Sequence, residues 1–389
     1  MPVSRRVAAS LSATIAVVSV AGLSVSAPAQ AAPAATAASC RSRVITRSPS
    51  PGPFLGLFGI SALSDQAAWA VGYYIKLDQS DFLTLIEHWN GKRWGIVPGP
   101  SAAPHGVLYA VAAASPADVW AVGAREINSA ANPVTLIDHW DGSAWHVVPS
   151  PTMPGLLDAL AVASPSDIWA VGFRKIDNGL KPEQTLVEHW DGVRWQVVPS
   201  PTPTKYGDGL GGVTVVSPDD IWATGNEGIS RFDSVPLAEH WDGHAWSAVP
   251  MPTQGFTSGL RGIGSAGSRN VWAVGWYDVE TQTGTLTFTM SERWNGHHWS
   301  IVSTPSPTGD DLLDGVAVLS AHDVWAVGSS GYNRTFVLHW TGHAWTTLPS
   351  QFLSGAVNNL WSVSAPSATD LWAAGGGYRT LLMHFCPKA

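Results

Sequence analysis

The stretch DIWAVGF (residues 167–173), followed by EHWDGVRW (residues 188–195), decides the fold of this chain. The first string, or a near relative of it, recurs along the sequence at intervals of 47 to 53 residues. A fixed period of this length is typical of repeat architectures in which each copy is one structural unit. The seven copies begin their motif at Trp69, Trp120, Trp169, Trp222, Trp272, Trp325 and Trp372.

One copy, residues 155–203, shows how a unit is organised. Short apolar runs separated by turn signals predict strands, and the Asp191-Gly192 pair predicts a two-residue hairpin turn with positive φ at both positions. No helical periodicity appears after the first 31 residues. Four short strands in about 50 residues, repeated seven times, predict an all-β, seven-bladed β-propeller of four-stranded blades. The predicted strands of this copy are 157–164, 168–173, 185–190 and 195–198.

The two ends of the sequence indicate how such a ring would close. The seventh copy stops after three predicted strands, and residues 43–51 end like the fourth strand of the other copies. We therefore expect the N-terminal strand to complete the last blade. Cys40 and Cys386 then fall beside the missing hairpin, which predicts a disulfide, because an exported chain meets an oxidising environment.

The N-terminus reads as a secretion signal over residues 1–31. Arg5 and Arg6 precede an apolar run over 7–25, and Ala29-Gln30-Ala31 fits a cleavage site. The sequence therefore predicts a secreted protein, with ordinary or twin-arginine export both open. The remaining chain is expected to comprise a short segment, one propeller and a tail, over residues 32–42, 43–386 and 387–389.

Composition and charge narrow the possible partners. The 389 residues include 21 Trp and 45% hydrophobic residues, which excludes a disordered chain. Without the signal the chain has 19 basic and 29 acidic residues and no basic run, which argues against nucleic acid and anionic membrane surfaces as partners. No later stretch is long and apolar enough to span a bilayer, so membrane insertion is not expected. A monomeric ring or a subunit of a hetero-complex is expected.

Several residues recur in most copies and need only a structural role. The histidines before the second tryptophan lie on separate blades, too far apart to share a metal ion, and Arg293 replaces one of them. The aspartates two residues before the first tryptophan are expected to accept backbone hydrogen bonds in a turn. No metal, cofactor or catalytic residue is predicted.

Function is expected where the copies differ. The connections between the second and third strands vary in length and share one face, which is the candidate binding face. At the start of each first strand a leucine is followed by a variable residue, and these seven residues would ring the channel mouth on that face. They are Phe58, Tyr109, Asp158, Gly211, Arg261, Asp314 and Trp361.

A second candidate group follows the second strand on the same face, and it includes Tyr74, Arg174, Tyr277, Tyr332 and Arg379. Aromatic faces and fixed polar groups suit a sugar or a peptide. The alternative is that the aromatic side chains only plug the channel while the charges pair with one another.

The repeated WAVG and HWDG motifs resemble those of secreted actinobacterial β-propeller proteins, and the likeness extends over about residues 43 to 386. A looser likeness runs to kelch, galactose-oxidase-type and tectonin-type lectin propellers. The resemblance implies binding rather than catalysis. It favours a lectin-like module for glycans or cell-surface polymers, with a protein-interaction or targeting subunit, for example of a secreted toxin complex, as the alternative. A glycoside hydrolase or lyase using Asp158 and Asp314 is the third possibility.

Overall fold

The computed structural model describes residues 43–45, 48–49, 51–52, 54–75, 82–100, 105–126, 133–151, 153–176, 181–331, 334–349, 358–377 and 379–385. These residues belong to a unit that spans Cys40–Ala389. The predicted secretion signal, both cysteines and Tyr332 lie outside the described residues. Every element in the described part of the chain is a β-strand, and no helix there is long and apolar enough to span a bilayer.

Five sheets each contain four antiparallel strands in sequence order. The copy at residues 155–203 forms one of these sheets, and its strands begin and end within a few residues of the predicted positions. In chain order the strands of the five sheets are β6 (Gly106–Ser115), β7 (Asp118–Arg125), β8 (Val134–Trp140) and β9 (Trp145–Val147); β10 (Gly155–Ser164), β11 (Asp167–Ile176), β12 (Lys181–Trp190) and β13 (Trp195–Val197); β14 (Asp208–Ser217), β15 (Asp220–Gly228), β16 (Ser234–Trp241) and β17 (Trp246–Ala248); β18 (Thr257–Ser265), β19 (Val271–Thr281), β20 (Gly284–Trp294) and β21 (Trp299–Ile301); and β22 (Asp311–Ser320), β23 (Asp323–Ser330), β24 (Arg334–Trp340) and β25 (Trp345–Thr347).

A sixth, eight-stranded sheet joins the two ends of the described chain. In it β1 pairs with β28 and β2 pairs with β27, so strands from the N-terminal part lie against strands from the C-terminal part. Its strands are β1 (Arg43–Ile45), β2 (Phe54–Ser64), β3 (Ala67–Ile75), β4 (Phe82–Trp89), β5 (Trp94–Ile96), β26 (Asn359–Ser367), β27 (Asp370–Gly377) and β28 (Thr380–Phe385).

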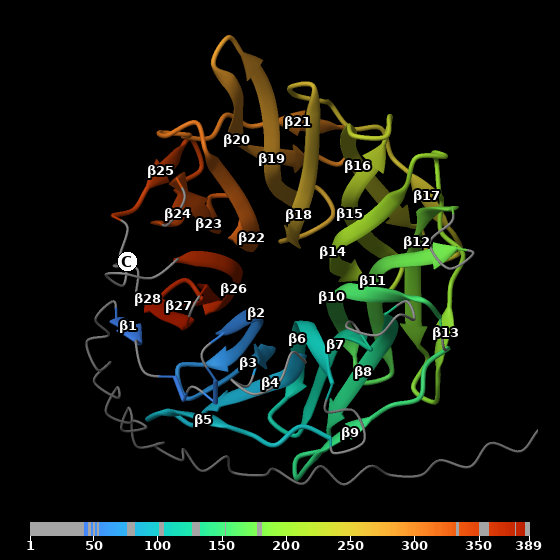
Figure 1. The fold of residues 1–389 in the computed structure, drawn as a ribbon, viewed down its shortest axis with the longest axis vertical. Coiled ribbons are helices and arrows are strands. Elements are labelled where there is room, and N and C mark those ends of the chain that lie inside the picture. Colours follow the sequence, from blue (N-terminus) through green and yellow to red (C-terminus); the bar gives the residue numbers. More distant parts are fainter. Residues whose placement is uncertain are drawn as a thin grey trace, which may run out of the picture. The chain divides into compact units, whose positions relative to one another are not determined.

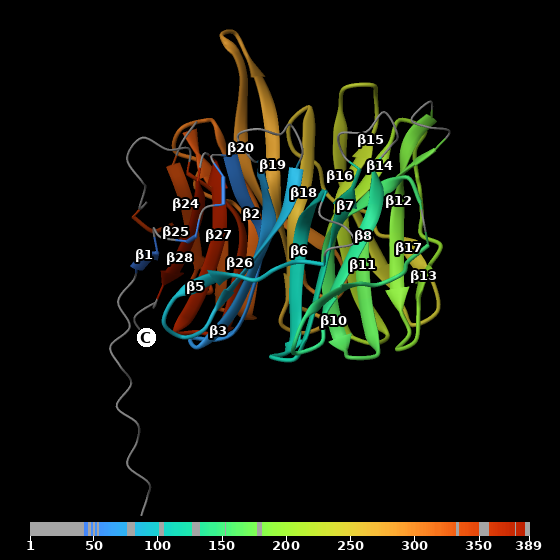
Figure 2. The same cartoon turned by 60° about the horizontal axis from the view of Figure 1, so that its bottom comes forward.

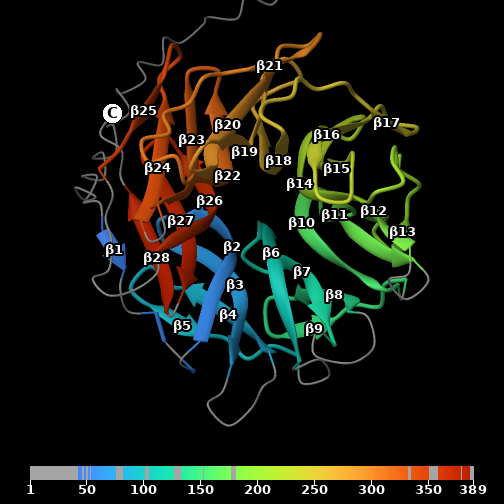
Figure 3. The same cartoon turned by 45° about the horizontal axis from the view of Figure 1, so that its top comes forward.

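The sheets are arranged around a common centre, to which each four-stranded sheet contributes its first strand and the eight-stranded sheet contributes β2 and β26 (Figures 1 and 3). Neighbouring first strands contact one another in the order β2, β6, β10, β14, β18, β22 and β26, and β26 also contacts β2. The hairpin of β19 and β20 rises above its neighbours because both strands are 11 residues long (Figure 2). The first strands therefore surround the axis on which a central site would lie.

The hydrophobic core lies between adjacent sheets rather than in one central body. One cluster combines Trp120 and Ile137 of one sheet with Leu157, Ile168 and Trp195 of the next. Other clusters repeat this composition between the other pairs of neighbouring sheets. The repeated tryptophans are therefore packing residues, as the motif analysis predicts.

The turn between the third and fourth strands differs from the prediction. The connection from Trp190 to Trp195 has four residues, and only Gly192 has positive φ, at 90°. The carboxylate of Asp191 accepts hydrogen bonds from the backbone amides of Val193 and Arg194, at 2.9 Å each. The expected two-residue turn was wrong, because an aspartate side chain closes a four-residue loop.

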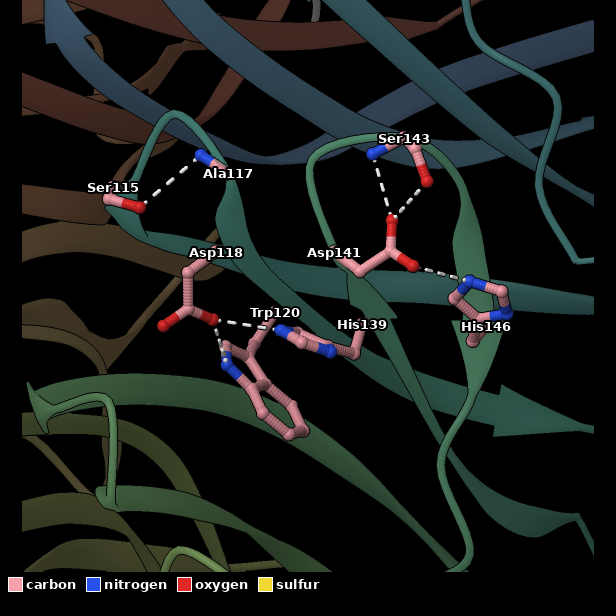
Figure 4. Close-up of polar contacts among 8 residues, drawn as sticks. All are labelled: Ser115, Ala117, Asp118, Trp120, His139, Asp141, Ser143 and His146. Atoms are coloured by element: carbon pink, nitrogen blue, oxygen red, sulfur yellow. Dashed lines mark hydrogen bonds and ion pairs between the residues drawn. The ribbon is translucent and has the colours of Figure 1, made fainter.

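The aspartate before the WAVG motif also behaves differently from the expectation. Oδ1 of Asp118 accepts hydrogen bonds from the indole Nε1 of Trp120 and from Nε2 of His139, at 2.8 Å each (Figure 4). The backbone of the neighbouring turn is satisfied instead by Ser115, whose hydroxyl accepts from the amide of Ala117. The prediction of backbone bonds was therefore wrong, and the repeated aspartate positions the tryptophan and histidine side chains.

Candidate functional site

A β-bulge interrupts the first strand of every copy at the variable position. In β10 the pairing with β11 passes from Leu157 directly to Ala159, which leaves Asp158 unpaired. A bulge inserts one extra residue, bends the strand and re-aims a side chain. The same shift occurs at every other variable residue of the column, namely Phe58, Tyr109, Gly211, Arg261, Asp314 and Trp361.

The glycine of WAVG makes room for this bulge. Gly172 pairs with Leu157 at the point where the pairing shifts. A Cβ on Gly172 would lie 2.0 Å from the carbonyl oxygen of Leu156, far closer than any side chain tolerates. The corresponding glycines of the other copies have the same clash, at 1.8 to 2.0 Å. The motif glycine therefore leaves the space that the backbone of the first strand of its own sheet occupies.

The seven bulged residues line a common cavity. It has a volume of about 600 Å³ and opens on the side where the first strands begin. A narrower space of about 230 Å³, lined by the same seven residues and those that follow them, lies along the channel. A cavity of a few hundred Å³ with mixed aromatic and polar walls has the size and character of a small-molecule site.

Aromatic side chains form one part of the cavity wall. The ring of Phe58 lies 4.7 Å from that of Trp361 and 5.4 Å from that of Tyr109, and it also stacks on Tyr73. The rings of Phe58, Tyr109 and Trp361 all remain partly exposed. Burial and the nearby carboxyl of Asp158 raise the pKa of Tyr109 to about 12, so its hydroxyl stays a neutral donor.

Charged side chains form the opposite part of the wall. Nη1 of Arg261 donates to Oδ1 of Asp314 at 2.5 Å, so part of the charge pairs as the alternative interpretation proposed. Asp158 makes no hydrogen bond or ion pair with any described residue. Burial raises the pKa of Asp158 to about 7, and the carboxyl of Glu183 adds to this while Arg261 opposes it.

The second predicted group does not reach this cavity. Tyr277 stacks on Phe288 at 5.5 Å and packs against the core, and Tyr74 packs against another core cluster. Nη2 of Arg174 donates to Gln184 at 2.8 Å, and Arg379 is exposed at the start of β28. Among the described residues, none of these four lines the cavity. Tyr332, the fifth, lies outside the described residues.

Several lining residues were not predicted from the sequence. Phe173 and Glu183 come from β11 and β12, and Tyr206 and Asn226 come from the β13–β14 connection and β15. The cavity extends over the sheet of the fourth copy, because the bulged residue of this copy is Gly211, whereas the other copies have larger residues at that position. The glycine-rich string at residues 207–212 was the sequence signal for this opening.

Carboxylates elsewhere do not assemble into a metal site. Within the described ranges, no group of three or more His, Cys, Asp or Glu side chains is placed to hold a metal ion. The repeated histidines instead stack on tryptophans, as His139 does on Trp120 with ring centroids 4.1 Å apart.

Comparison with known proteins gives a fold and no family. No family model matches the sequence, and no curated protein matches it. Among solved structures, YCF48 from Cyanidioschyzon merolae is 14% identical, with a TM-score of 0.55 over 90% of this chain and 100% of that chain. A related structure shows YCF48 bound to D1 peptide.

Two further structures have the same fold at similarly low identity. A chain of the mitotic checkpoint complex is 10% identical, with a TM-score of 0.56 over 96% of this chain and 99% of that one. A polysaccharide lyase described as an ulvan lyase is 12% identical, with a TM-score of 0.52 over 88% and 96%. These proteins are β-propellers, and the described part of this chain is therefore an all-β structure with a propeller-like arrangement of four-stranded antiparallel sheets.

Proposed function

We propose that this protein is a secreted, non-enzymatic β-propeller that binds a carbohydrate or cell-surface polymer in the central cavity, in the manner of a lectin. The observation that carries the proposal is the set of bulges that places the seven variable residues, six of them with side chains, at one cavity. Residues that vary between copies have no common packing role, so their convergence favours a binding site. Exposed aromatic faces beside fixed polar groups suit a sugar ring.

The proposal includes a ring of seven blades. The pairing of β1 with β28 supports closure by the N-terminal strand, since it gives the last blade a fourth strand. In this arrangement the eight-stranded sheet is two blades joined through β2 and β27. We further propose a disulfide between Cys40 and Cys386. Mass spectrometry of the unreduced, protease-digested protein should recover the linked peptides, and two free thiols would contradict this closure.

Glycan-array binding tests the proposed function. Trp361→Ala and Tyr109→Ala should each lose most of the binding, because each removes an aromatic face from the cavity wall. Phe232→Ala is the matched control, since that ring is 84% exposed on a loop and does not line the cavity. Absence of binding to any glycan, or equal binding by the wild type and both cavity variants, would refute the proposal. Turnover of a bound polysaccharide that disappears in Asp314→Asn would show an enzyme instead.

A protein partner is the second candidate, and an exposed apolar patch favours it. Tyr206, Ile229, Phe232 and Phe256 are 44% to 84% exposed on connections beside β14, β15 and β18. Exposed apolar patches frequently mark protein–protein interfaces. A pull-down from culture medium should then recover a stoichiometric partner that is lost in Phe232→Ala. A protein that stays alone at every concentration would count against this role.

A further inference from the structure

We propose that the central cavity selects a saccharide that carries a free ammonium group, with Asp158 and Glu183 as the carboxylates that receive it beside the ring of Tyr109. This inference rests on the carbohydrate-binding function proposed above. It adds the chemical class of the ligand and the residues that determine the selectivity.

The charge of the cavity wall is the first argument. Four carboxyl groups line the cavity, from Asp158, Glu183, Asp208 and Asp314, against the single guanidinium of Arg261. No lysine or histidine is among the described lining residues. Clefts lined by one sign of charge concentrate ligands of the opposite sign. The wall therefore favours a cation over a neutral or an acidic ligand.

The partners of these carboxyls decide which of them is free for a ligand. Asp208 accepts hydrogen bonds from the amide and hydroxyl of Thr204, at 3.1 and 2.9 Å. Asp314, whose side chain is only 6% exposed, holds Arg261 through Oδ1, and its Oδ2 has no partner among the described residues. Asp158 has no partner among the described residues and is only partly exposed. Asp158 is consequently the carboxyl best placed to gain from a ligand cation.

Glu183 and Tyr109 complete this subsite. Asp158 and Glu183 line the same cavity, and the charge of Glu183 raises the pKa of Asp158 in the same direction as burial. Glu183 is exposed at the cavity rim, and Lys175 partly offsets its charge. The ring of Tyr109 is close enough to Asp158 to be affected by its charge. An ammonium group gains from a carboxylate and an aromatic face together.

The size of the site favours a saccharide over a protein segment as the source of the ammonium group. The cavity has about 600 Å³, which suits a few sugar rings, whereas stable protein interfaces bury roughly 1,200–2,000 Å². The wall of Trp361 and Phe58 offers aromatic faces on which a sugar ring can stack. An amino sugar presents such a ring and an ammonium group in one unit.

The proposal predicts a specific pH dependence of binding. Burial raises the pKa of Asp158 to about 7 and also raises the pKa of Glu183, so both are largely protonated in mildly acidic solution. An ammonium ligand needs them ionised, and its binding should release protons. The other ionisable groups that face Asp158 are Arg261, Tyr109 and Asp314. Asp314 is ion-paired with Arg261, and the raised pKa of Tyr109 keeps its hydroxyl neutral in this range.

Calorimetric titration of the intact protein with two probes tests the inference. The probes are a glucosamine trimer, which carries free amino groups, and an N-acetylglucosamine trimer, which does not. Near pH 7 we expect at least about tenfold tighter binding of the glucosamine trimer, the effect of one charge-assisted contact. The preference should shrink at about pH 5 as Asp158 takes up a proton. Asp158→Asn should remove the preference for the glucosamine trimer.

Glu280→Gln is the matched control, because Glu280 is exposed on β19 and does not line the cavity. Glu280→Gln should retain the preference for the glucosamine trimer. If it lost as much of this preference as Asp158→Asn does, the preference would depend only on the net charge of the protein, and the proposal would be overturned. Equal or tighter binding of the acetylated trimer would overturn the amino-sugar selectivity while leaving carbohydrate binding intact. Binding of neither trimer would also overturn it, and the glycan array then decides the proposed function separately. Equal melting temperatures for Asp158→Asn and the wild type confirm that the variant is folded.

Discussion

In five copies the tryptophan that begins the WAVG motif donates its indole N–H to the side chain two positions before it. Oδ1 of Asp167 accepts hydrogen bonds from Nε1 of Trp169 and Nε2 of His189, at 2.8 Å each. The first copy has Ala67 at this position, and there the indole Nε1 of Trp69 is buried with no partner among the described residues. The repeated aspartate is thus an acceptor whose contribution to stability can be removed in one blade and added in another.

We predict that Asp167→Ala lowers the free energy of unfolding by about 2–3 kcal/mol, because it leaves a buried indole N–H without an acceptor. Denaturant unfolding measures the change. The reciprocal variant Ala67→Asp should raise the melting temperature, since it supplies the acceptor that Trp69 lacks. Unchanged stability in Asp167→Ala would show that the network has no structural role.

The sequence showed where these residues recur, but the hydrogen-bond partners predicted for the aspartate were wrong. The spacing of Asp167 from Trp169 was visible as a repeat, and a turn role followed from ordinary aspartate chemistry. The pairing with His189 is set by the alignment of the second and third strands, Trp169 opposite His189, and strand alignment is a property of the folded sheet.

At the scale of the strand, the β-bulge turns the variable residue of each repeat toward the cavity. The leucine–variable-residue pattern and the WAVG glycine were both visible in the sequence, and the seven variable residues line one cavity in the structure. The bulge was not predicted, because one extra residue in a strand looks like any other residue until the pairing is known. Tyr74, Arg174, Tyr277 and Arg379 were predicted to lie on the same face as the channel mouth, and they are not among the described residues that line the cavity.

We predict that Gly172→Ala destabilises the protein by about 3 kcal/mol or more, since its Cβ would lie 2.0 Å from the carbonyl oxygen of Leu156. The melting temperature provides the measurement. Gly95→Ala in β5 is the matched control and should be neutral, because no atom lies within 4 Å of its Cβ. Similar melting temperatures for Gly172→Ala and Gly95→Ala would refute the role of the motif glycine.

A second prediction at this scale concerns carboxyls buried in the third strands. Burial raises the pKa of Glu188 to about 8, and of the corresponding Glu87 and Asp138 to about 7. A carboxyl with a raised folded pKa stabilises fully below its unfolded value of about 4.3, and this stability is lost as pH rises toward the folded pKa. Stability should therefore decline between about pH 4.5 and 8.

Glu188→Gln should reduce that decline by up to about 1.4 kcal/mol per pH unit and should make the protein more stable than the wild type at pH 8. Denaturant unfolding across this pH range measures the slope. Glu280→Gln, at an exposed position, should leave the slope unchanged. A wild-type stability that is flat or rising over the range would contradict the burial of these carboxyls as neutral acids.

At the scale of the whole molecule, the period of the repeat was enough to predict a propeller, because each copy can bury its apolar faces only against its neighbours. The cavity could not be predicted in the same way. Its volume depends on Gly211, whose missing side chain opens the wall above β14, and on loop residues such as Tyr206 that follow no repeat. The ligand chemistry follows from which carboxyls find partners in the folded ring, and no repeat pattern encodes that.

Blocking the cavity tests the central claim most directly. A Cβ on Gly211 would have only ordinary contacts, the nearest at 3.5 Å from the carbonyl oxygen of Leu260, so Gly211→Trp can place a ring in the cavity without disturbing the strand. We predict that Gly211→Trp abolishes glycan-array binding and keeps the wild-type melting temperature, while Phe232→Ala retains binding. Full binding by a folded Gly211→Trp variant would contradict the assignment of the central cavity as the binding site.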